Sequence, residues 1–283
     1  MVNRKALREK FLKIAKEKTR EHLMRDDLYI IQLERALEEL TTIANNMYER
    51  LEEWYGIHFP ELKLKDRKEY VDVVLNLDMN NIDSYSGPRA ERVKELAKKT
   101  RGAKLDKESL DKIKKLATML SNTYELMEEY EEHIEKVVSK LMPNSYELVG
   151  GKLVAMFLSH AGSLEKLAEM PASTIQVLGA EKALFKHLRS KGKISPPKHG
   201  IILLSNYVGS LPKRVRGRMA RTLAGKLALA FKADIAKDYI ADKLKNIVEK
   251  RYEELKKVKL EKREKKPKQG RQGKKGRFKK RRK

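Results

Sequence analysis

Residues 26–57 read DDLYIIQLERALEELTTIANNMYERLEEWYGI and hold the strongest fold signal in this 283-residue chain. Apolar side chains recur here at alternating spacings of three and four residues, at Ile30, Leu33, Leu37, Leu40, Ala44, Met47, Leu51 and Trp54. This repeat of about 3.5 residues is typical of a coiled-coil seam, whereas the face of a globular helix repeats every ~3.6 residues. We therefore predict one long helix whose seam packs against another helix.

A second apolar seam lies further along the chain, at Leu110, Ile113, Ala117, Leu120, Tyr124, Met127, Ile134 and Val138. Glu131 interrupts it where a core position is expected, and Asp106 is a suitable N-cap for its helix. The two seams predict an antiparallel coiled-coil arm, with an ordinary helical bundle as the alternative. The two seams need not bury each other's apolar side chains completely, so pairing between two copies of the chain is also expected.

The residues between the seams predict a compact helical insert rather than a tight turn. Pro60 ends the first helix, and Asp66 with Glu69 forms a capping box that opens a short helix. After a break at Asn80-Asn81, Gly87-Pro88 places proline at the first position of another helix, which continues to about Lys99.

The second half of the chain also reads as helical. The capping box Asn144–Glu147 after Pro143 predicts a helix to about Ser159 and marks a domain boundary. Further helices are expected over 164–169, 180–189, 217–233 and from about 235 into the 250s, with a loop at 172–179 and a connector at 190–200. Residues 201–204 fit either a strand or a buried loop. Residues 262–283 are mostly Lys and Arg and are expected to be disordered.

These elements predict an all-α fold, in which an antiparallel coiled-coil arm is followed by a helical domain and a disordered basic tail. The expected units are a basic junction helix (1–25), the arm with its insert (26–143), the helical domain (144–258) and the tail (259–283).

The charge is distributed unevenly. The chain carries 65 Lys and Arg against 40 Asp and Glu, a formal net charge of +25. Residues 1–144 are neutral, 145–255 carry +10 and 256–283 carry +15. A basic half of this kind predicts a polyanionic partner. The chain has no cysteine, which excludes disulfides, thiolate catalysis and cysteine-based zinc sites, and no apolar run is long enough to cross a bilayer.

Two groups of basic residues are candidates for binding an anion. Gly179 precedes a helix on which Lys182, Lys186 and Arg189 form one stripe, with Leu184 and Leu188 on another face suited to packing. A solvated amphipathic helix is the alternative. The second group, Lys213–Arg221, places five cations near a helix start, where an anion would offset their repulsion by the helix dipole, although they could also serve solubility alone. The tail fits a non-specific tether for nucleic acid, or a nuclear import signal in a eukaryote.

The search for catalytic groups finds none. The six histidines are scattered without metal-ligand spacing, and Ser163 and Ser173 lack the surroundings of a nucleophile. Gly150-Gly151-Lys152 lacks the remaining residues of a P-loop. We expect no catalytic residue, no metal and no cofactor, and hence no enzymatic activity.

Several motifs resemble the Nop-domain family, whose archaeal members are scaffolds of box C/D small ribonucleoproteins. The resemblance rests on Gly162-Ser163-Leu164, on the run PASTIQVLGAEKALF at 171–185, on Pro197–Gly200 and on Leu223–Ala228. The segment WYGIHFPEL at 54–62 is similar to the tip of the family's coiled coil. Together these motifs extend the resemblance over about residues 26–255.

The resemblance implies an RNA-binding scaffold that reads a composite surface. Such a protein docks onto a kink-turn in a box C/D guide RNA already bound by a ribosomal-type kink-turn protein, and it self-associates through its coiled coil. The assembly then places a fibrillarin-type methyltransferase for ribose 2′-O-methylation. Family members usually hold that enzyme with an N-terminal domain, which is not seen before residue 26, so direct binding of the methyltransferase does not follow from this sequence. A spliceosomal-type scaffold of the same domain, or less readily a stand-alone RNA-modifying enzyme, is the alternative.

The site residues follow from the motifs and the basic groups. The residues expected to bind RNA are Thr174, Gln176, Gly179, Ala180, Glu181, Lys182, Lys186, Arg189, Lys198, His199, Arg214, Arg218 and Arg221. A contact with the end of the guide–target duplex is expected of Ala183, Leu184 and Phe185, where Lys186 replaces the family's usual Arg. Dimerisation is expected of Leu33, Leu37, Leu40, Met47, Leu51, Leu120, Tyr124 and Met127. The expected location is the cytoplasm of an archaeon, or the nucleolus of a eukaryote.

Overall fold

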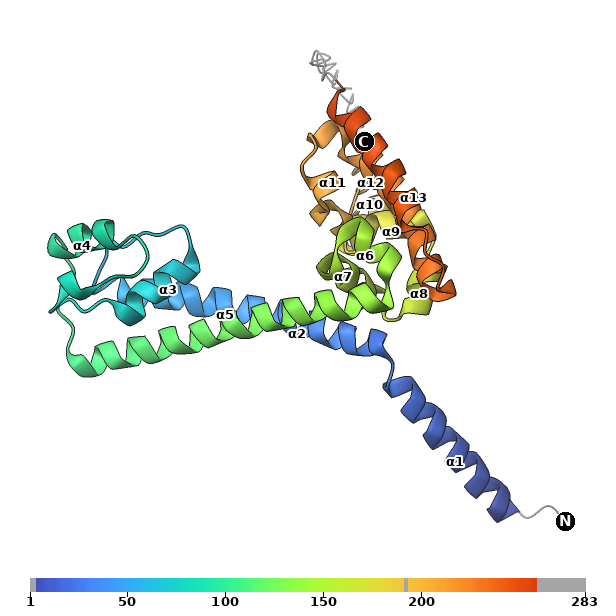
Figure 1. Ribbon diagram of the computed structural model, residues 1–283, viewed down its shortest axis with the longest axis horizontal. Helices are drawn as coiled ribbons and strands as arrows, with labels where there is room; N and C mark the ends of the chain where they lie inside the picture. The colour runs from blue at the N-terminus through green and yellow to red at the C-terminus, as the bar shows by residue number, and fades with distance from the viewer. Residues whose placement is uncertain (1–3, 191–192, 259–283) are drawn as a thin grey trace, which may run out of the picture.

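The computed structural model describes residues 4–190 and 193–258. Within these ranges every regular element is a helix, which confirms the all-α class. A two-helix arm joins a helical body at one end, and the first helix, α1 (Arg4–Leu23), projects from the same end (Figure 1). The disorder expected for the tail concerns residues 259–283, which lie outside the described ranges.

The arm consists of α2 (Asp26–Tyr55) and α5 (Lys107–Leu141), which run side by side in opposite directions (Figure 1). Asp106 caps α5 as predicted, since its carboxylate accepts a hydrogen bond from Ser109 N at 3.0 Å. The predicted seam is correct at Ile30, Leu33, Leu37, Ala44 and Leu51, which are buried, and is displaced by one residue at Met47 and Trp54.

Packing of aromatic side chains explains the displacement of the seam. Tyr48 and Tyr55 are buried in place of Met47 and Trp54. Both tyrosines pack edge-on against Tyr70 of the insert, with ring centroids 5.5 and 6.3 Å away. A repeat of about 3.5 residues does not distinguish Met47 from Tyr48, or Trp54 from Tyr55. Packing against the insert therefore decides which side chain of each pair is buried.

The insert contains α3 (Arg67–Asn76), the 3₁₀ helix η1 (Ile82–Ser84) and α4 (Ala90–Lys98). Asp66 caps α3 as predicted, accepting from Lys68 N at 2.8 Å and Glu69 N at 3.3 Å. The helix predicted to open at Pro88 begins later, at Ala90, because Arg89 adopts a left-handed conformation (φ 53°). The insert and the distal arm share a core of their own.

Four of the eight residues predicted for dimerisation are buried within a single chain. Leu33, Leu37, Leu51 and Leu120 are buried within the chain, with at most 8% of their surface exposed. They therefore hold the two arm helices and the body together and cannot meet a second copy unless the arm opens. Leu40, Met47, Tyr124 and Met127 are only half-buried.

The body contains the remaining helices: α6 (Pro143–Val149), α7 (Gly151–Ala161), α8 (Leu164–Glu169), α9 (Ala172–Val177), α10 (Glu181–Arg189), η2 (Ile201–Leu204), α11 (Asn206–Gly209), α12 (Lys213–Ala236) and α13 (Ala241–Lys256). Residues 172–177 are thus helical and not a loop, because Ile175 is buried in the core. Residues 201–204 form a 3₁₀ helix, neither a strand nor a loop. The helix expected from Gly217 begins at Lys213, and the last helix begins at Ala241, after the left-handed Lys237 (φ 59°).

The helix predicted from Asn144 is split at Gly150, whose φ is +81°. Asn144 is not its cap. Its side chain is buried, donates to Asp234 Oδ1 at 2.9 Å and accepts from Ile240 N at 2.7 Å. The buried carboxylate of Asp234 also accepts from Asn144 N and Ser145 N, and so occupies the start of α6. These bonds tie α6 to the connection between α12 and α13.

The arm is joined to the body along α7. Lys152 pairs with Glu131 at 2.6 Å, and the carboxylate of Glu135 accepts from Gly151 N and Lys152 N, each at 3.0 Å. The break that Glu131 makes in the second seam therefore marks a place where α5 contacts α7, while Tyr29 of α2 still packs edge-on against His133 of α5. The proximal arm and the body share one apolar core.

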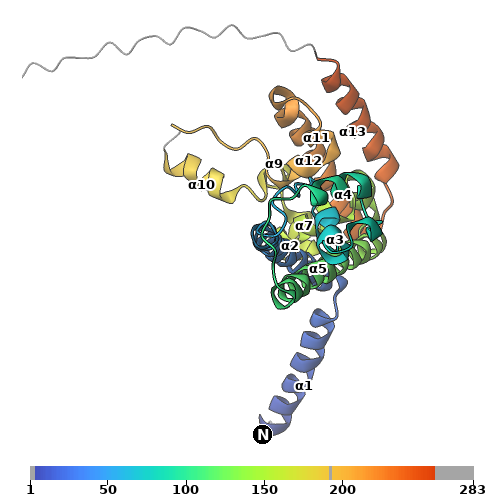
Figure 2. The same cartoon turned by 90° about the vertical axis from the view of Figure 1, so that its left-hand side faces the viewer.

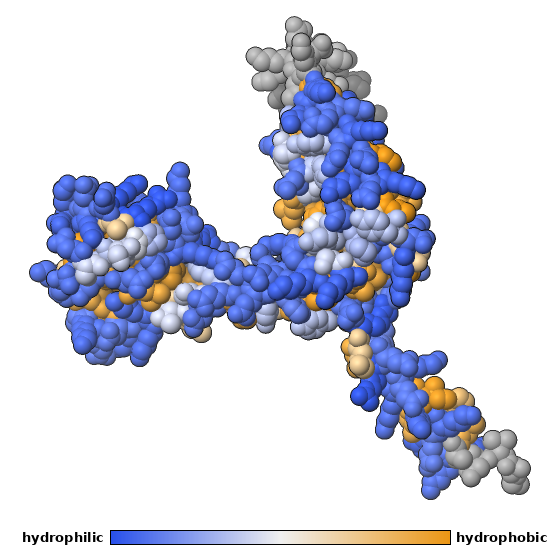
Figure 3. Space-filling view, viewed as in Figure 1, coloured by the Kyte–Doolittle hydropathy of each residue, from blue (hydrophilic) through white to orange (hydrophobic). Residues whose placement is uncertain are grey.

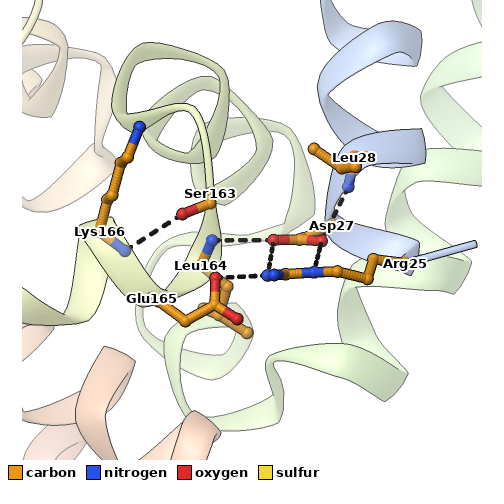
Figure 4. Close-up of polar contacts among 7 residues, drawn as sticks. All are labelled: Arg25, Asp27, Leu28, Ser163, Leu164, Glu165 and Lys166. Carbon is orange, nitrogen blue, oxygen red and sulfur yellow. Dashed lines mark hydrogen bonds and ion pairs between the residues drawn. The ribbon is translucent and has the colours of Figure 1, made fainter. Parts of the chain in front are cut away.

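A polar clamp fixes the start of α2 to α8 (Figure 4). The buried Asp27 accepts from Arg25 at 2.6 and 3.0 Å and from Leu164 N at 3.0 Å, and Arg25 also pairs with Glu165. Burial opposes ionisation of Asp27, but these bonds outweigh it and lower its pKa.

Beyond this clamp, α1 is exposed along its described length. Every side chain described between residues 4 and 24 is exposed, including Leu7, Phe11 and Leu12, and Figure 3 shows apolar atoms on its surface. The predicted junction helix is thus confirmed as a helix. Across the described residues, no helix combines the length and apolar character needed to cross a membrane.

Candidate nucleic-acid interface

The predicted basic helix α10 stands on a rigid base formed by two crossing segments. Gly200 N donates to Gln176 O at 2.9 Å, and Ile201 N donates to Leu178 O at 2.8 Å. Gly200 is required at this crossing, since a Cβ there would lie 1.8 Å from Leu178 O. Gly179 adopts a φ of +81°, which favours glycine, and turns the chain into α10.

Two predicted RNA-binding residues support this base with their side chains. Gln176 donates from Nε2 to Lys198 O at 2.6 Å, which fixes the returning segment. The carboxylate of Glu181 accepts from Gly179 N at 2.7 Å and so closes the turn. The structure therefore gives Gln176 and Glu181 a supporting role, while leaving Thr174 exposed on α9.

The helix α10 projects from the body and buries none of its residues (Figure 2). Lys182, Lys186 and Arg189 are exposed, and with Phe185 and Ile194 they line a shallow hollow. Phe185 is 58% exposed and Leu188 60%. Of the two side chains on the face suited to packing, Leu184 is half-buried, whereas the expectation that Leu188 packs against the protein was wrong.

A second basic segment lies beside the base of α10. Gly217 of α12 lacks a side chain, and a Cβ there would meet the side chain of Lys198 at 3.4 Å. The segment with Lys198 and His199 therefore lies against the start of α12, whose exposed cations include Lys213, Arg218 and Arg221. Burial, aided by the nearby Arg216, lowers the pKa of His199 and favours its neutral form near pH 7.

Not every cation at the start of α12 is free for an external anion. Arg216 donates to Leu211 O at 2.7 Å and Gly209 O at 2.8 Å and so holds the preceding loop in place. The exposed Arg214 also has a partner within the protein. The accessible part of the predicted basic surface consists of α10 together with the exposed Lys198, Lys213, Arg218 and Arg221.

No cluster of three or more His, Asp or Glu that could hold a metal exists among residues 4–190 and 193–258. An all-helical body that carries a long arm and a projecting basic helix defines a helical scaffold with a surface suited to polyanions.

A family model described as snoRNA binding domain, fibrillarin (Nop) matches residues 36–257. The chain belongs to this Nop family. It is 39% identical over 253 residues to an uncharacterized NOP5 family protein of Methanocaldococcus jannaschii, covering 86% of this chain and 61% of that protein. It is 35% identical over 225 residues to nucleolar protein 58 of Botryotinia fuckeliana, covering 76% of this chain and 39% of that protein.

Among solved structures, the chain is similar to a chain in the crystal structure of a fibrillarin/Nop5p complex. The TM-score is 0.53 at 30% identity, and the match covers 89% of this chain and 78% of the other. The sequence therefore spans about two fifths to three fifths of the two curated relatives described above.

Proposed function

We propose that this chain is a core scaffold of a box C/D ribonucleoprotein, and that it binds a kink-turn RNA jointly with the RNA's kink-turn protein. The observation that carries the proposal is α10, a helix with three exposed cations and two exposed apolar side chains that buries none of its residues. Membership of the Nop family supports the RNA as the partner.

The surface suits a composite partner better than RNA alone. Lys182, Lys186 and Arg189 provide charge for phosphates, which is strong but unspecific. Phe185 and Leu188 offer apolar area that a protein surface or the end of a base-paired duplex would cover. The rigid base at Gly179 and Gly200 keeps α10 in position, so little ordering is needed on binding.

The wider assembly is part of the proposal. The units proposed are the arm (26–143) and the body (144–258), with a methyltransferase of the fibrillarin type supplying the chemistry. Self-association through the arm would use side chains that the intramolecular core leaves exposed, namely Ile43 (49%) and Met119 (64%), beside the half-buried Leu40. Such a particle works in the archaeal cytoplasm or the eukaryotic nucleolus.

Gel shifts with a kink-turn RNA test the composite surface. Binding should be weak with RNA alone and tight once the kink-turn protein is present. Lys182→Ala should weaken the ternary complex and reduce the dependence of log K on log salt by about one unit. Lys232→Ala, which removes an exposed cation elsewhere on the body, is the matched control. Equal affinity with and without the kink-turn protein would contradict the proposal.

Light scattering tests self-association through the exposed side chains of the arm. We expect wild-type protein to associate at micromolar concentration and Ile43→Glu/Met119→Glu to remain monomeric with unchanged helix content. A monomeric wild-type chain would refute self-association through this face.

A further inference from the structure

The distal end of the arm carries a concentration of cations that the proposed function does not use. Two loops meet there, residues 56–66 after α2 and residues 99–106 before α5. Ala103 N donates to Ile57 O at 2.8 Å, and Arg101 N donates to Glu61 Oε1 at 2.9 Å. These bonds place the two loops side by side at the end away from the body (Figure 1).

Six exposed cations lie at this end of the arm, five in the two loops and one at the first residue of α5: Lys63, Lys65, Lys99, Arg101, Lys104 and Lys107. Their side chains form no ion pair among the residues that the structure describes. We call this group the distal basic cluster.

The same segments contain three acidic residues, whose carboxylates accept hydrogen bonds from other groups. Glu61 accepts from Arg101 N and from Thr100 Oγ1 at 2.7 Å, while Asp66 and Asp106 cap α3 and α5. Six cations against three carboxylates leave a positive excess. The helical shaft of the arm, represented by α2, has the opposite net charge, because α2 carries eight acidic and two basic residues. Positive charge is therefore concentrated where the acidic shaft ends.

Exposed apolar surface adjoins the distal basic cluster. Trp54, the only tryptophan of the chain, lies in the last turn of α2 and is 36% exposed, and Ile57, beside Ala103, is 53% exposed. Cations beside an exposed aromatic ring are the pattern by which proteins hold unpaired nucleic acid, since phosphates pair with the cations and bases stack on the ring.

We propose that the distal end of the arm is a second RNA-binding site, which takes the phosphate backbone of an unpaired RNA segment on the distal basic cluster and stacks a base on Trp54. The 30 residues of α2 span about 45 Å. RNA held at this site is thus far from RNA held at α10, and the arm spaces the two contacts. The inference does not depend on the kink-turn proposal, because it concerns other residues and another form of RNA.

Trp54 provides a local reporter. In the full-length chain, titration with an unstructured oligouridylate of about twelve nucleotides should quench Trp54 emission. The variant Lys99→Glu/Arg101→Glu/Lys104→Glu should weaken this binding at least tenfold. It should also lower the salt slope by about two units, as expected when three contacts to single-stranded phosphates are lost. The matched control, Lys182→Glu/Lys186→Glu/Arg189→Glu on α10, should leave the quenching unchanged.

The outcomes separate the two sites. Quenching that survives the distal variant, or disappears with the α10 variant, would overturn the inference. Absence of any Trp54 signal at about 100 μM oligouridylate would also overturn it, whatever the kink-turn gel shifts show. Equal quenching by polyglutamate at the same charge concentration would assign the cluster to an acidic protein segment instead of RNA.

Discussion

Glu34 provides a quantitative test of how the arm is joined to the body. It lies on α2 with only 7% of its surface exposed, and its Oε2 has no hydrogen-bond partner. Burial raises its pKa from the usual 4.5 to about 7, against the attraction of Lys152 and with the repulsion of Glu38 and Glu131. The folded protein therefore holds a proton that the unfolded chain releases at lower pH.

The direction in which pH changes the stability follows from this difference in proton binding between the folded and unfolded protein. Below about pH 4.5 the carboxyl is protonated in both states. Between about pH 4.5 and 7 the unfolded chain ionises first, so stability falls as pH rises, and above 7 the loss persists. A shift of about 2.5 units corresponds to about 3 kcal/mol at about 1.36 kcal/mol per unit. Solvent screening reduces this, and we expect about 1–2 kcal/mol.

Glu34→Gln removes the ionisation while keeping the shape of the side chain. In urea unfolding followed by circular dichroism, the stability of the variant relative to wild type should increase by about 1–2 kcal/mol between about pH 5 and about pH 8. Glu49→Gln, an exposed change further along the same helix, should not alter the pH dependence. The same pH dependence in wild type and Glu34→Gln would refute the reasoning.

Three other changes test single contacts. Asp234→Ala removes a buried acceptor for Asn144 and Ser145, and should cost about 3–5 kcal/mol in urea unfolding. Gly200→Ala forces a Cβ against Leu178 O and should release the base of α10, measured as faster hydrogen exchange at the amide of Ile201. Asp27→Asn should cost about 2 kcal/mol near neutral pH; wild type should lose this advantage as the pH falls through the lowered pKa of Asp27, so the two unfolding curves should converge in acid.

The arm could be predicted from the sequence because a heptad repeat is a local pattern. The exact seam could not, since Tyr48 or Met47 satisfies a repeat of 3.5 equally well and the choice depends on Tyr70, which is distant in sequence. The helix α9 was missed for a related reason. Its residues Thr174, Ile175 and Val177 are β-branched and disfavour helix, and burial of Ile175 outweighs that preference.

The candidate surface shows a similar limit. Spacing alone placed Lys182, Lys186 and Arg189 on one exposed stripe, because all three belong to one helix. Spacing could not show that Gln176 and Glu181 point back to their own backbone, or that Arg216 is committed to carbonyls of the preceding loop. Residue type reveals which side chains can bind an anion, whereas only the hydrogen bonds reveal which are available.

The neutral charge of residues 1–144 conceals a separation along the arm. The helix α2 has six more acidic than basic residues, while the distal loops have an excess of cations. An acidic shaft repels a polyanion, so RNA contacts are favoured at the body and at the distal end and disfavoured between them. Because the repulsion at the shaft is screened beyond about 8 Å at physiological salt, the two ends act as separate sites. A neutral total is therefore compatible with RNA binding, since the polyanion senses the local charge rather than the sum.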